Sequence, residues 1–343
     1  MLELLHVTKS FNLTGAAEDE RIALDNVSLQ IKPGEFITII GGNGSGKSTT
    51  LNIVSGSLNP DKGKVLLNGF DVSKIPEYKR AAYFGRVFQD PMKGTASEMS
   101  VLENLEVAYV RGRTHSPIRW GFSASHKKYF IEELKRFGLG LEDRLNQKVG
   151  VMSGGQRQAL TLLMATIRQR PSERVIKRDY VRFCETDKTK AKEEVEKAFL
   201  DAKNERKEAL LALKGEALSK EEIKAKKVEI TKTYQDKIYK FDLTKQILLL
   251  DEHTAALDPK TAAKVLELTE KIVIENQMTT IMITHNMKDA IRYGTRLIMM
   301  SHGKVVVDVS GEEKKKLTVE QLLNMFQVAS KDDTMSDAAI LGD

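Results

Sequence analysis

The sequence predicts an α/β domain with a mainly parallel sheet, and two observations carry this prediction. The first is the stretch Gly41–Thr49 (GGNGSGKST), which fits the phosphate-binding P-loop pattern. The apolar run Phe36–Ile40 precedes it and a helix-forming stretch, Ser48–Val54, follows it, so the motif has the strand–loop–helix context that it requires. The second is that short apolar runs alternate with helical patterns, as in parallel sheets covered by helices.

The predicted strands are short runs rich in apolar or β-branched residues, and turn-forming residues close several of them. They cover Leu2–Lys9, Ile22–Ile31, Phe36–Ile40, Lys64–Asn68, Tyr83–Phe88, Gln246–Leu250 and Thr279–Ile283. Apolar residues at helical spacing predict helices between them. Two helices are predicted within Ser97–Gly140, the second of them over His126–Phe137. Others are predicted over Val151–Ile167, over Pro259–Asn276 and in a last segment that ends near Phe326.

The P-loop residues have the chemistry to hold the phosphates of a nucleotide. Its glycines let backbone N–H groups turn toward an anion, and the N-terminus of the following helix adds a partial positive charge. The Lys47 ammonium can reach the β- and γ-phosphates, and the Ser48 hydroxyl can ligate Mg²⁺. The predicted nucleotide-binding residues of this loop are Gly41, Asn43, Gly44, Ser45, Gly46, Lys47, Ser48 and Thr49.

Length and composition narrow the class of protein. A chain of 343 residues with 41% hydrophobic and 30% charged residues can bury the core of one large domain or two smaller ones. The net charge of +6 is too small to favour nucleic acid as a partner. The single cysteine, Cys184, excludes an internal disulfide and fits a reducing compartment. We expect no signal peptide, because the N-terminal MLELLHVTKSF has no basic region followed by a long apolar core. We expect no membrane-spanning segment, because no apolar run reaches about 18 residues.

Further motifs narrow the nucleotide chemistry. The segment Met152–Gln156 (MSGGQ) opens a helix, where Ser153 can cap the helix and the glycines expose N–H groups to an anion. Asp251 and Glu252 end the run LLLDE, so that Asp251 can hold Mg²⁺ through water at the end of a strand. The segment Ala255–Asp258 (AALD) follows directly.

Two more polar residues, Gln89 and His285, each follow a short apolar strand. In this order, the motifs resemble the nucleotide-binding subunit of ATP-binding-cassette (ABC) transporters, over about residues 1–170 and 243–327. The resemblance implies a P-loop NTPase core with a RecA-like parallel sheet, an N-terminal antiparallel β subdomain and a helical subdomain at about 92–165.

The resemblance also implies roles for the residues around the phosphates. Lys47 and Ser48 match the Walker A lysine and magnesium ligand, and Gln89 matches the Q-loop glutamine that touches Mg²⁺. Asp251 matches the Walker B aspartate, a further magnesium ligand. Glu252 matches the general base that polarises the attacking water, and an ordinary charged strand end is the alternative for this residue.

The remaining matches concern the base, the γ-phosphate and a second protomer. His285 matches the switch histidine that senses the γ-phosphate, Phe11 matches the aromatic residue that stacks on adenine, and Asp258 lies in the D-loop. A structural role is the alternative for both His285 and Phe11. The signature residues, which complete the ATP site of the opposite protomer, are Ser153, Gly154, Gly155 and Gln156.

The sequence departs from the family pattern at two single positions. Met152 replaces the usual leucine of the signature, a volume-conserving change that we expect to be tolerated. His253 replaces the proline that commonly follows the Walker B glutamate. A neutral imidazole at this position should spare the chemistry.

The largest departure is an insertion. Ser153 and Asp251 lie 98 positions apart, far more than the family needs, which places an insertion at about 172–242 inside an ATPase domain of 1–171 and 243–327. Its composition predicts a charged helical hairpin: one helix over Lys188–Lys214 and a second that starts at the capping box Ser219–Glu222. The hairpin is either a solvated spacer or a docking arm for an unknown partner, whereas nucleic-acid binding is disfavoured because its acidic and basic residues balance. The tail, 328–343, is polar, and we expect it to be flexible.

The strings DEHTAALDPKTAAKVLELTEKIV, THNMKDAIRYGTRLIMM and GEEKKKLTVEQLL resemble one subgroup of bacterial ABC importers. That resemblance implies an ATPase peripheral to the cytoplasmic face of the membrane, working with a permease and, indirectly, with a lipoprotein receptor. Amino acids such as tryptophan or tyrosine are the implied cargo.

The mechanism that we expect is head-to-tail dimerisation around two ATP molecules with Mg²⁺, followed by hydrolysis that moves the permease. Four alternatives are open: an exporter ATPase, a soluble ABC-type ATPase of chromosomes or repair, one of translation, and a nucleotide-gated module without turnover. The ATPases of chromosomes or repair normally carry a helical arm between the Walker A motif and the signature, whereas the insertion here follows the signature. The translation ATPases usually carry two cassettes in one chain, and this sequence shows one. The last alternative would need Glu252 to be missing.

Overall fold

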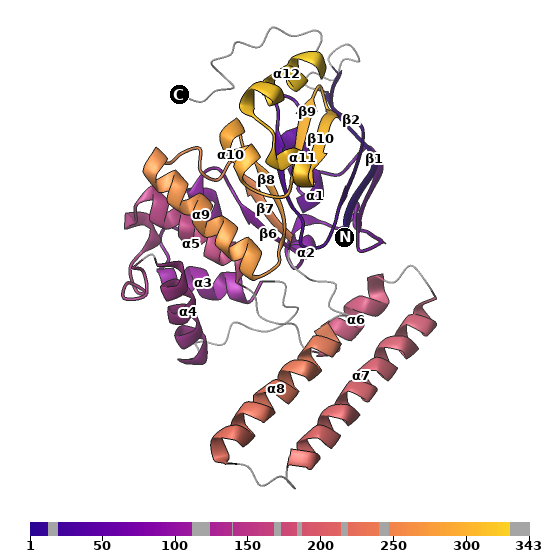
Figure 1. Cartoon of the computed structure of the whole chain (residues 1–343), viewed down its shortest axis with the longest axis vertical. Helices are drawn as coiled ribbons and strands as arrows, with labels where there is room; N and C mark the ends of the chain where they lie inside the picture. Colours follow the sequence, from indigo (N-terminus) through magenta and orange to yellow (C-terminus); the bar gives the residue numbers. More distant parts are fainter. Residues whose placement is uncertain are drawn as a thin grey trace. The chain divides into compact units, whose positions relative to one another are not determined.

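The computed structural model describes the chain in eight stretches. These are residues 1–12, 20–111, 124–138, 140–167, 173–183, 187–213, 219–239 and 247–329. The chain divides into two compact units, which we describe separately (Figure 1). The sheet unit comprises Met1–Leu67, Asp71–Gln169 and Gln246–Asp343, and the arm unit comprises Asn68–Phe70 and Arg170–Lys245.

The centre of the sheet unit is a six-stranded sheet in the order β10-β9-β3-β8-β7-β6. Its strands are β3 (Phe36–Ile40), β6 (Phe84–Val87), β7 (Ile247–Asp251), β8 (Thr279–Ile283), β9 (Arg296–Ser301) and β10 (Lys304–Ser310). All neighbours are parallel except β10, which pairs antiparallel with β9. Every residue of β3 is buried, as expected for a strand covered on both faces. The predicted mainly parallel sheet is therefore confirmed, although β9 and β10 were not among the predicted strands.

A second sheet confirms the expected N-terminal antiparallel subdomain. Its order is β2-β1-β4-β5. The strands are β1 (Leu2–Asn12), β2 (Glu20–Ile31), β4 (Lys62–Leu67) and β5 (Phe70–Asp71). β1 pairs antiparallel with both β2 and β4. Leu2, Leu4 and Val7 of β1 are buried while Leu5 and His6 are exposed, so one face of this sheet contributes to the core.

Helices cover both faces of the central sheet. Helices α5 (Gly154–Thr166) and α9 (Pro259–Glu275) pack on one face, through a buried cluster that includes Leu162, Leu250 and Leu266. The P-loop helix α1 (Lys47–Ser55) contacts β7 and β2. At the β9 and β10 side, a further cluster joins α10 (Met287–Arg292) and α12 (Val319–Ala329), and α11 (Gly311–Lys315) contacts β9, β10 and α10.

Three helices of the sheet unit share a separate core. Helices α3 (Val101–Tyr109) and α4 (Ala124–Phe137) pack with α5 through fully buried residues such as Leu105, Phe130 and Leu160. Helices α3 and α4 lie in the predicted helical segment Ser97–Gly140, of which residues 112–123 and 139 lie outside the described part. The remaining short elements are α2 (Glu77–Arg80), η2 (Pro91–Gly94) and η3 (Val149–Val151).

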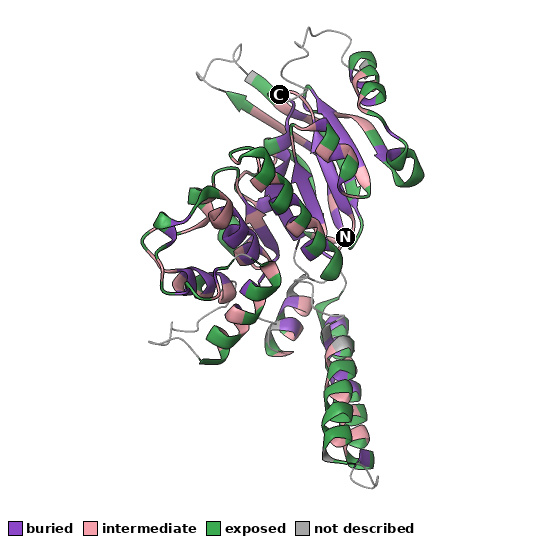
Figure 2. Ribbon diagram, turned by 60° about the vertical axis from the view of Figure 1, so that its left-hand side comes forward, coloured by how far each residue is buried: buried purple, intermediate pink, exposed green. Residues whose placement is uncertain are grey.

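The arm unit contains the predicted helical hairpin and one helix more. Helices α7 (Lys188–Ala212) and α8 (Lys220–Tyr239) pack side by side, and α6 (Glu173–Phe183) packs against α7. The arm core is small: Ile176, Val195, Phe199, Ala202, Tyr234 and Ile238. Figure 2 shows it as a narrow buried stripe on otherwise exposed helices. The sequence analysis did not predict α6, although five of its eleven residues are apolar: Val175, Ile176, Tyr180, Val181 and Phe183.

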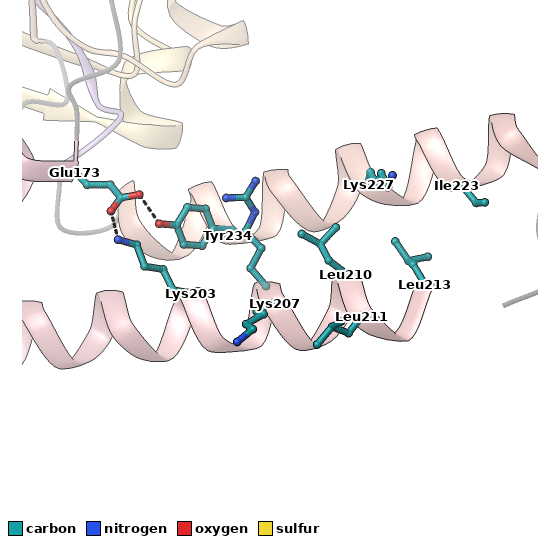
Figure 3. A pocket seen from close by; sticks show the side chains of 10 residues that line it. Glu173, Lys203, Lys207, Leu210, Leu211, Leu213, Ile223, Lys227 and Tyr234 are labelled. Atoms are coloured by element: carbon teal, nitrogen blue, oxygen red, sulfur yellow. Dashed lines mark hydrogen bonds and ion pairs between the residues drawn. The ribbon is translucent and has the colours of Figure 1, made fainter. Parts of the chain in front are cut away.

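Polar contacts and a concavity lie beside this core (Figure 3). Glu173 accepts a hydrogen bond of 2.5 Å from the Tyr234 hydroxyl and pairs with Lys203 at 2.7 Å. Further along the hairpin, Leu210 and Ile223 line a concavity of about 850 Å³ between α7 and α8.

Two expectations concern the chain ends and membranes. Helix α12 continues to Ala329, so residues 328 and 329 of the predicted tail are helical, and residues 330–343 lie outside the described part. Among the described residues, no helix combines the length and apolar character needed to cross a membrane.

Candidate functional site

The predicted catalytic residues meet at one edge of the central sheet. Strands β3, β8, β7 and β6 are parallel and adjacent, so their carboxyl ends lie next to one another. The P-loop follows β3, Asp251 ends β7, His285 comes after β8, and Gln89 comes after β6. Residues separated by up to about 250 positions in the chain are thus brought to one place, where open α/β sheets bind their ligands.

The P-loop backbone has a shape that only glycine allows at two positions. Gly41 has φ 149° and Gly46 has φ 102°. A Cβ atom would lie 2.2 Å from the Met300 carbonyl oxygen at Gly41, and 2.6 Å from the Ala23 carbonyl oxygen at Gly46. Helix α1 starts with no side-chain cap, which leaves its first N–H groups directed at the loop. This arrangement fits the phosphates of a nucleotide.

Lys47 and Ser45 support the same assignment. The Lys47 ammonium donates hydrogen bonds to the carbonyl oxygens of Gly41 (2.7 Å) and Gly42 (2.9 Å), and the side chain is buried. Burial lowers the pKa of Lys47, and the charges of Glu252 and Asp251 oppose that shift. The buried hydroxyl oxygen of Ser45 has no hydrogen-bond partner among the described residues, which suits a loop that closes around an anion.

Glu252 and His285 form a direct pair. The Oε1 atom of Glu252 lies 2.5 Å from Nε2 of His285. The hydrogen bond from His285 holds the pKa of Glu252 below its usual value, against the opposing effect of burial. Glu252 also has a left-handed backbone, φ 47°, and its N–H donates to the Ile283 carbonyl at 3.1 Å. A strained residue at this point directs the carboxylate toward the neighbouring strand end.

Asp251 has a partner that the sequence analysis missed. Its Oδ2 atom accepts a hydrogen bond of 3.0 Å from Arg86 on β6. The signal was present in the sequence, because Arg86 is the one charged residue in the otherwise apolar segment Tyr83–Phe88. A predicted strand that contains Arg86 does not show which strand lies next to it in the sheet, and therefore does not show that the guanidinium reaches Asp251.

His253 is neutral, as the sequence analysis expected. It is fully buried, and burial lowers its pKa from 6.5 to about 4. Its Nε2 lies 3.2 Å from the Thr269 hydroxyl, which itself donates to the Val265 carbonyl at 2.7 Å. Nε2 is therefore the protonated nitrogen that donates to Thr269. The imidazole ties the β7 end to helix α9.

The signature residues lie at the start of α5. Ser153 caps this helix in a reciprocal capping box with Gln156, and Ser153 and Gly154 are exposed. Within the described residues, no hydrogen bond or ion pair joins this segment to the P-loop of the same chain. Asp258 caps α9 by accepting a hydrogen bond from the Thr261 N–H, at 3.0 Å.

The other predicted site residues differ in exposure. Ser48, Asn43, Gly44 and Gln89 are exposed, and Thr49 is half-buried. Phe11 is 36% exposed near the end of β1, where it pairs in register with Arg21 of β2. Ala23, two residues along β2, places its carbonyl against Gly46, so this end of the antiparallel sheet approaches the P-loop.

The oxygen atoms of Ser48, Gln89 and Asp251 suit Mg²⁺, which takes few protein ligands and completes its shell with phosphate and water. No group of three or more His, Cys, Asp or Glu side chains fit to hold a metal occurs in the described ranges.

The fold and the site define an ATPase of the P-loop class. Residues 24–172 match the family model described as ABC transporter. The chain is 35% identical to the tyrosine transport ATP-binding protein of Clostridioides difficile (strain R20291), over 96% of this chain and 100% of that protein. The chain therefore belongs to the ATP-binding subunits of ABC transporters.

Two further comparisons agree. The methionine import ATP-binding protein MetN of Corynebacterium glutamicum is 26% identical, over 89% of this chain and 61% of that protein. The solved dimeric post-hydrolysis state of the ATP-binding cassette MJ0796, bound to ADP and Pi, matches with a TM-score of 0.57 and 25% identity. The match covers 90% of this chain and 98% of that one. ATP is thus the nucleotide of this site.

Proposed function

We propose that this ATPase energises the import of tyrosine or a related aromatic amino acid through a separate permease. The observation that carries the catalytic part is the pairing of Glu252 with His285 beside Asp251 and Lys47. The cargo rests on the likeness to the tyrosine transport protein, which spans nearly the whole chain. A soluble or exporting ATPase is the alternative that the transport experiment below tests.

Each residue of the site has a distinct part in hydrolysis. Lys47 and the N–H groups of α1 balance the phosphate charge, and Glu252 accepts a proton from the attacking water. Glu252 is ionised at neutral pH, as a base must be, and the hydrogen bond from His285, which lowers its pKa, favours that ionised form. His285 holds the Glu252 carboxylate in place, and its match to the switch histidine gives it the part of sensing the γ-phosphate.

Magnesium and adenine have proposed partners as well. Ser48, Gln89 and Asp251 would hold Mg²⁺, which supplies positive charge to the phosphate oxygens. Phe11 would stack on adenine, because its ring is half-exposed at the end of the antiparallel sheet near the P-loop. Asn43, Gly44 and Thr49 would complete the phosphate loop.

The active unit in this proposal is a head-to-tail dimer. The exposed Ser153 and Gly154 leave the start of α5 open to the γ-phosphate bound by a second copy, together with Gly155 and Gln156. Asp258, at the start of α9, would lie at the same interface. The dimeric form of the MJ0796 cassette supports this arrangement. A peripheral position at the cytoplasmic face would bring the dimer to its permease and, indirectly, to a lipoprotein receptor.

The test is reconstitution with the permease encoded by the same organism in proteoliposomes, followed by uptake of radiolabelled tyrosine. We expect ATP-dependent uptake that excess unlabelled tryptophan reduces and that lysine leaves unchanged. In parallel, Glu252→Gln with ATP should elute as a dimer in size-exclusion chromatography, while the same variant without ATP elutes as a monomer. ATP hydrolysis without any coupled uptake, or release of preloaded tyrosine, would contradict the import proposal.

For the inserted arm at about 172–242, a docking role is favoured over that of a spacer. Leu210, Leu213 and Ile223 line the concavity between α7 and α8, and Leu211 beside them is 53% exposed. The concavity is also lined by Arg206, Lys207 and Lys227, and by Lys203, which pairs with the lining residue Glu173. An apolar floor with a basic rim fits a segment of the permease that carries apolar residues flanked by acidic ones.

Co-purification with the permease tests this role. Leu210→Glu combined with Leu211→Glu should weaken retention of the permease at least tenfold, because both changes place acidic charge in the groove. Glu205→Gln, a change on α7 outside the lining residues, serves as the control and should retain it. Equal retention by the two proteins would favour the spacer.

A further inference from the structure

Arg86 lies next to the strand that ends in Asp251. Its Cα is in register with Leu249 of β7, two residues before that aspartate. Side chains alternate along a strand, and the neighbouring Val87 packs into the cluster beneath α5 and α9. Arg86 therefore points to the opposite face of the sheet, toward α1.

The contacts of Arg86 hold its guanidinium against two elements, β7 and α1. Nη2 donates to Asp251 on β7 at 3.0 Å and to Asn52 on α1 at 2.8 Å. Nη1 lies 3.4 Å from the hydroxyls of Ser55 and Ser57, at the end of α1. The guanidinium also stacks on the ring of Phe88, 4.7 Å from its centroid. With 14% of its side chain exposed, Arg86 is held far more tightly than a surface arginine.

This placement puts the permanent positive charge of the guanidinium beside the Asp251 carboxylate, which our proposed function names as a ligand of Mg²⁺. A second cation at Asp251 would meet the like charge of the guanidinium a few ångströms away in a half-buried site. The phosphates of a bound nucleotide carry the negative charge that removes this conflict. A cation that arrives with ATP is therefore tolerated, while a cation alone is opposed.

We propose that Arg86 is a positioning residue that holds the Asp251 carboxylate toward α1 and makes divalent-cation binding at Asp251 depend on bound nucleotide. The inference rests on the proposed magnesium role of Asp251. A purely structural Arg86 would link β6, β7 and α1 and would change stability without changing cation affinity.

The test is a titration of the full-length protein with Mn²⁺, in which electron paramagnetic resonance measures the free ion. It is carried out without nucleotide and with a non-hydrolysable ATP analogue. The variants are Arg86→Met, which removes the charge, and Arg86→Lys, which keeps it. The control is Arg296→Met, because Arg296 is 16% exposed and pairs with Asp308 at 2.6 Å, outside the site.

Without nucleotide, Arg86→Met should bind Mn²⁺ about tenfold more tightly than the unchanged protein. Arg86→Lys and Arg296→Met should stay within about twofold of it. With the nucleotide analogue, the gain in Arg86→Met should shrink to about twofold or less, because the phosphates already compensate the guanidinium. Adding Asp251→Asn to Arg86→Met should abolish the gain.

An unchanged Mn²⁺ affinity in a folded Arg86→Met protein overturns the inference, and so does a gain that survives Asp251→Asn. If Arg86→Met does not fold, as judged by circular dichroism, Arg86→Gln makes the same test while it keeps a donor toward Asn52. A failure of the proposed magnesium role looks different. In that case the single variant Asp251→Asn binds Mn²⁺ together with the analogue as tightly as the unchanged protein.

Discussion

The two units of this protein are stabilised in contrasting ways. In the sheet unit, four of the five residues of β7 are buried and apolar. In the arm unit, helix α7 has 25 residues, of which Ala191, Val195, Phe199 and Ala202 are buried. The sheet unit therefore rests on many overlapping apolar contacts, whereas the arm rests on a short row of them along helices whose other faces are largely polar.

This difference explains where the chemistry lies. The carboxylates and the histidine of the site lie at or just after the ends of strands, and packing on both faces of the sheet holds these strands in place. This keeps pairs such as Glu252 and His285 at hydrogen-bond distance. A helical hairpin with one row of core residues gives a long surface instead. It suits contact with another protein rather than catalysis. The predictions that follow test this contrast, from the largest expected effect to the smallest.

The largest contrast concerns one carboxylate in each unit. Glu252→Gln should lower the rate of ATP hydrolysis by about 10²–10⁴-fold, because the amide cannot accept the proton of the attacking water. The same change at Glu205 of α7, which pairs with Lys237, should leave the rate within about twofold. Phosphate release from purified protein with saturating Mg²⁺ and ATP measures both. Near-normal turnover in Glu252→Gln would remove the base assignment.

The second contrast concerns one core side chain in each unit. Phe199→Ala should destabilise the arm by about 3–5 kcal/mol, since this fully buried ring packs between Ile176, Val195 and Tyr234. ATP hydrolysis should change less than about twofold. Leu250→Ala, beneath α5 and α9, should cost about 2–5 kcal/mol and lower activity as well.

Hydrogen exchange resolved along the chain measures these two effects separately. We expect lost protection in α6, α7 and α8 alone for Phe199→Ala, because its ring also packs against Ile176 of α6, and in the central sheet for Leu250→Ala. Equal loss of activity in both variants would show that the arm core and the sheet core are coupled.

The third contrast concerns acid. Burial lowers the pKa of His253 to about 4, so the native state leaves this imidazole neutral while the unfolded chain protonates it below its ordinary pKa of 6.5. Stability from this group is thus complete above pH 6.5 and declines as pH falls toward 4, by about 2 kcal/mol between pH 7 and pH 5. His253→Gln should remove that decline, as measured by urea unfolding at the two pH values.

The arm supplies the internal reference for this experiment. It contains no histidine, since none occurs between residues 170 and 245. Unfolding followed by hydrogen exchange in α7 and α8 should therefore show no such decline over this range. If His253→Gln keeps the full decline, the acid sensitivity belongs to other groups of the sheet unit.

The smallest effect concerns a half-exposed ion pair. Lys203→Met should change the free energy of unfolding of the arm by less than about 1 kcal/mol, because Lys203 is 52% exposed and its partner Glu173 is 36% exposed. The hydrogen bond from Tyr234 still holds that carboxylate. Thermal unfolding followed by circular dichroism at 222 nm suffices as the measurement. A larger loss would mean that the arm depends on charge pairs more than on its apolar row.

The sequence by itself determined the central strands, the P-loop and the insertion. Phe36–Ile40 and Thr279–Ile283 were predicted with the bounds that the structure has, because a strand buried on both faces needs a continuous apolar run. The P-loop could be predicted because all the glycines, the lysine and the serine of its motif lie within the nine consecutive residues Gly41–Thr49. Such features are local, so the order of residues alone carries them.

Tertiary structure decided the contacts between distant segments. Glu252 meets His285 because β7 and β8 are neighbours, and Arg86 reaches Asp251 because β6 lies beside β7. Neither distance follows from spacing along the chain, since strand order depends on how all helices and strands pack together. Helix α6 likewise joins the arm core through the contact of its Ile176 with Val195 and Phe199 of α7, which spacing along the chain does not predict.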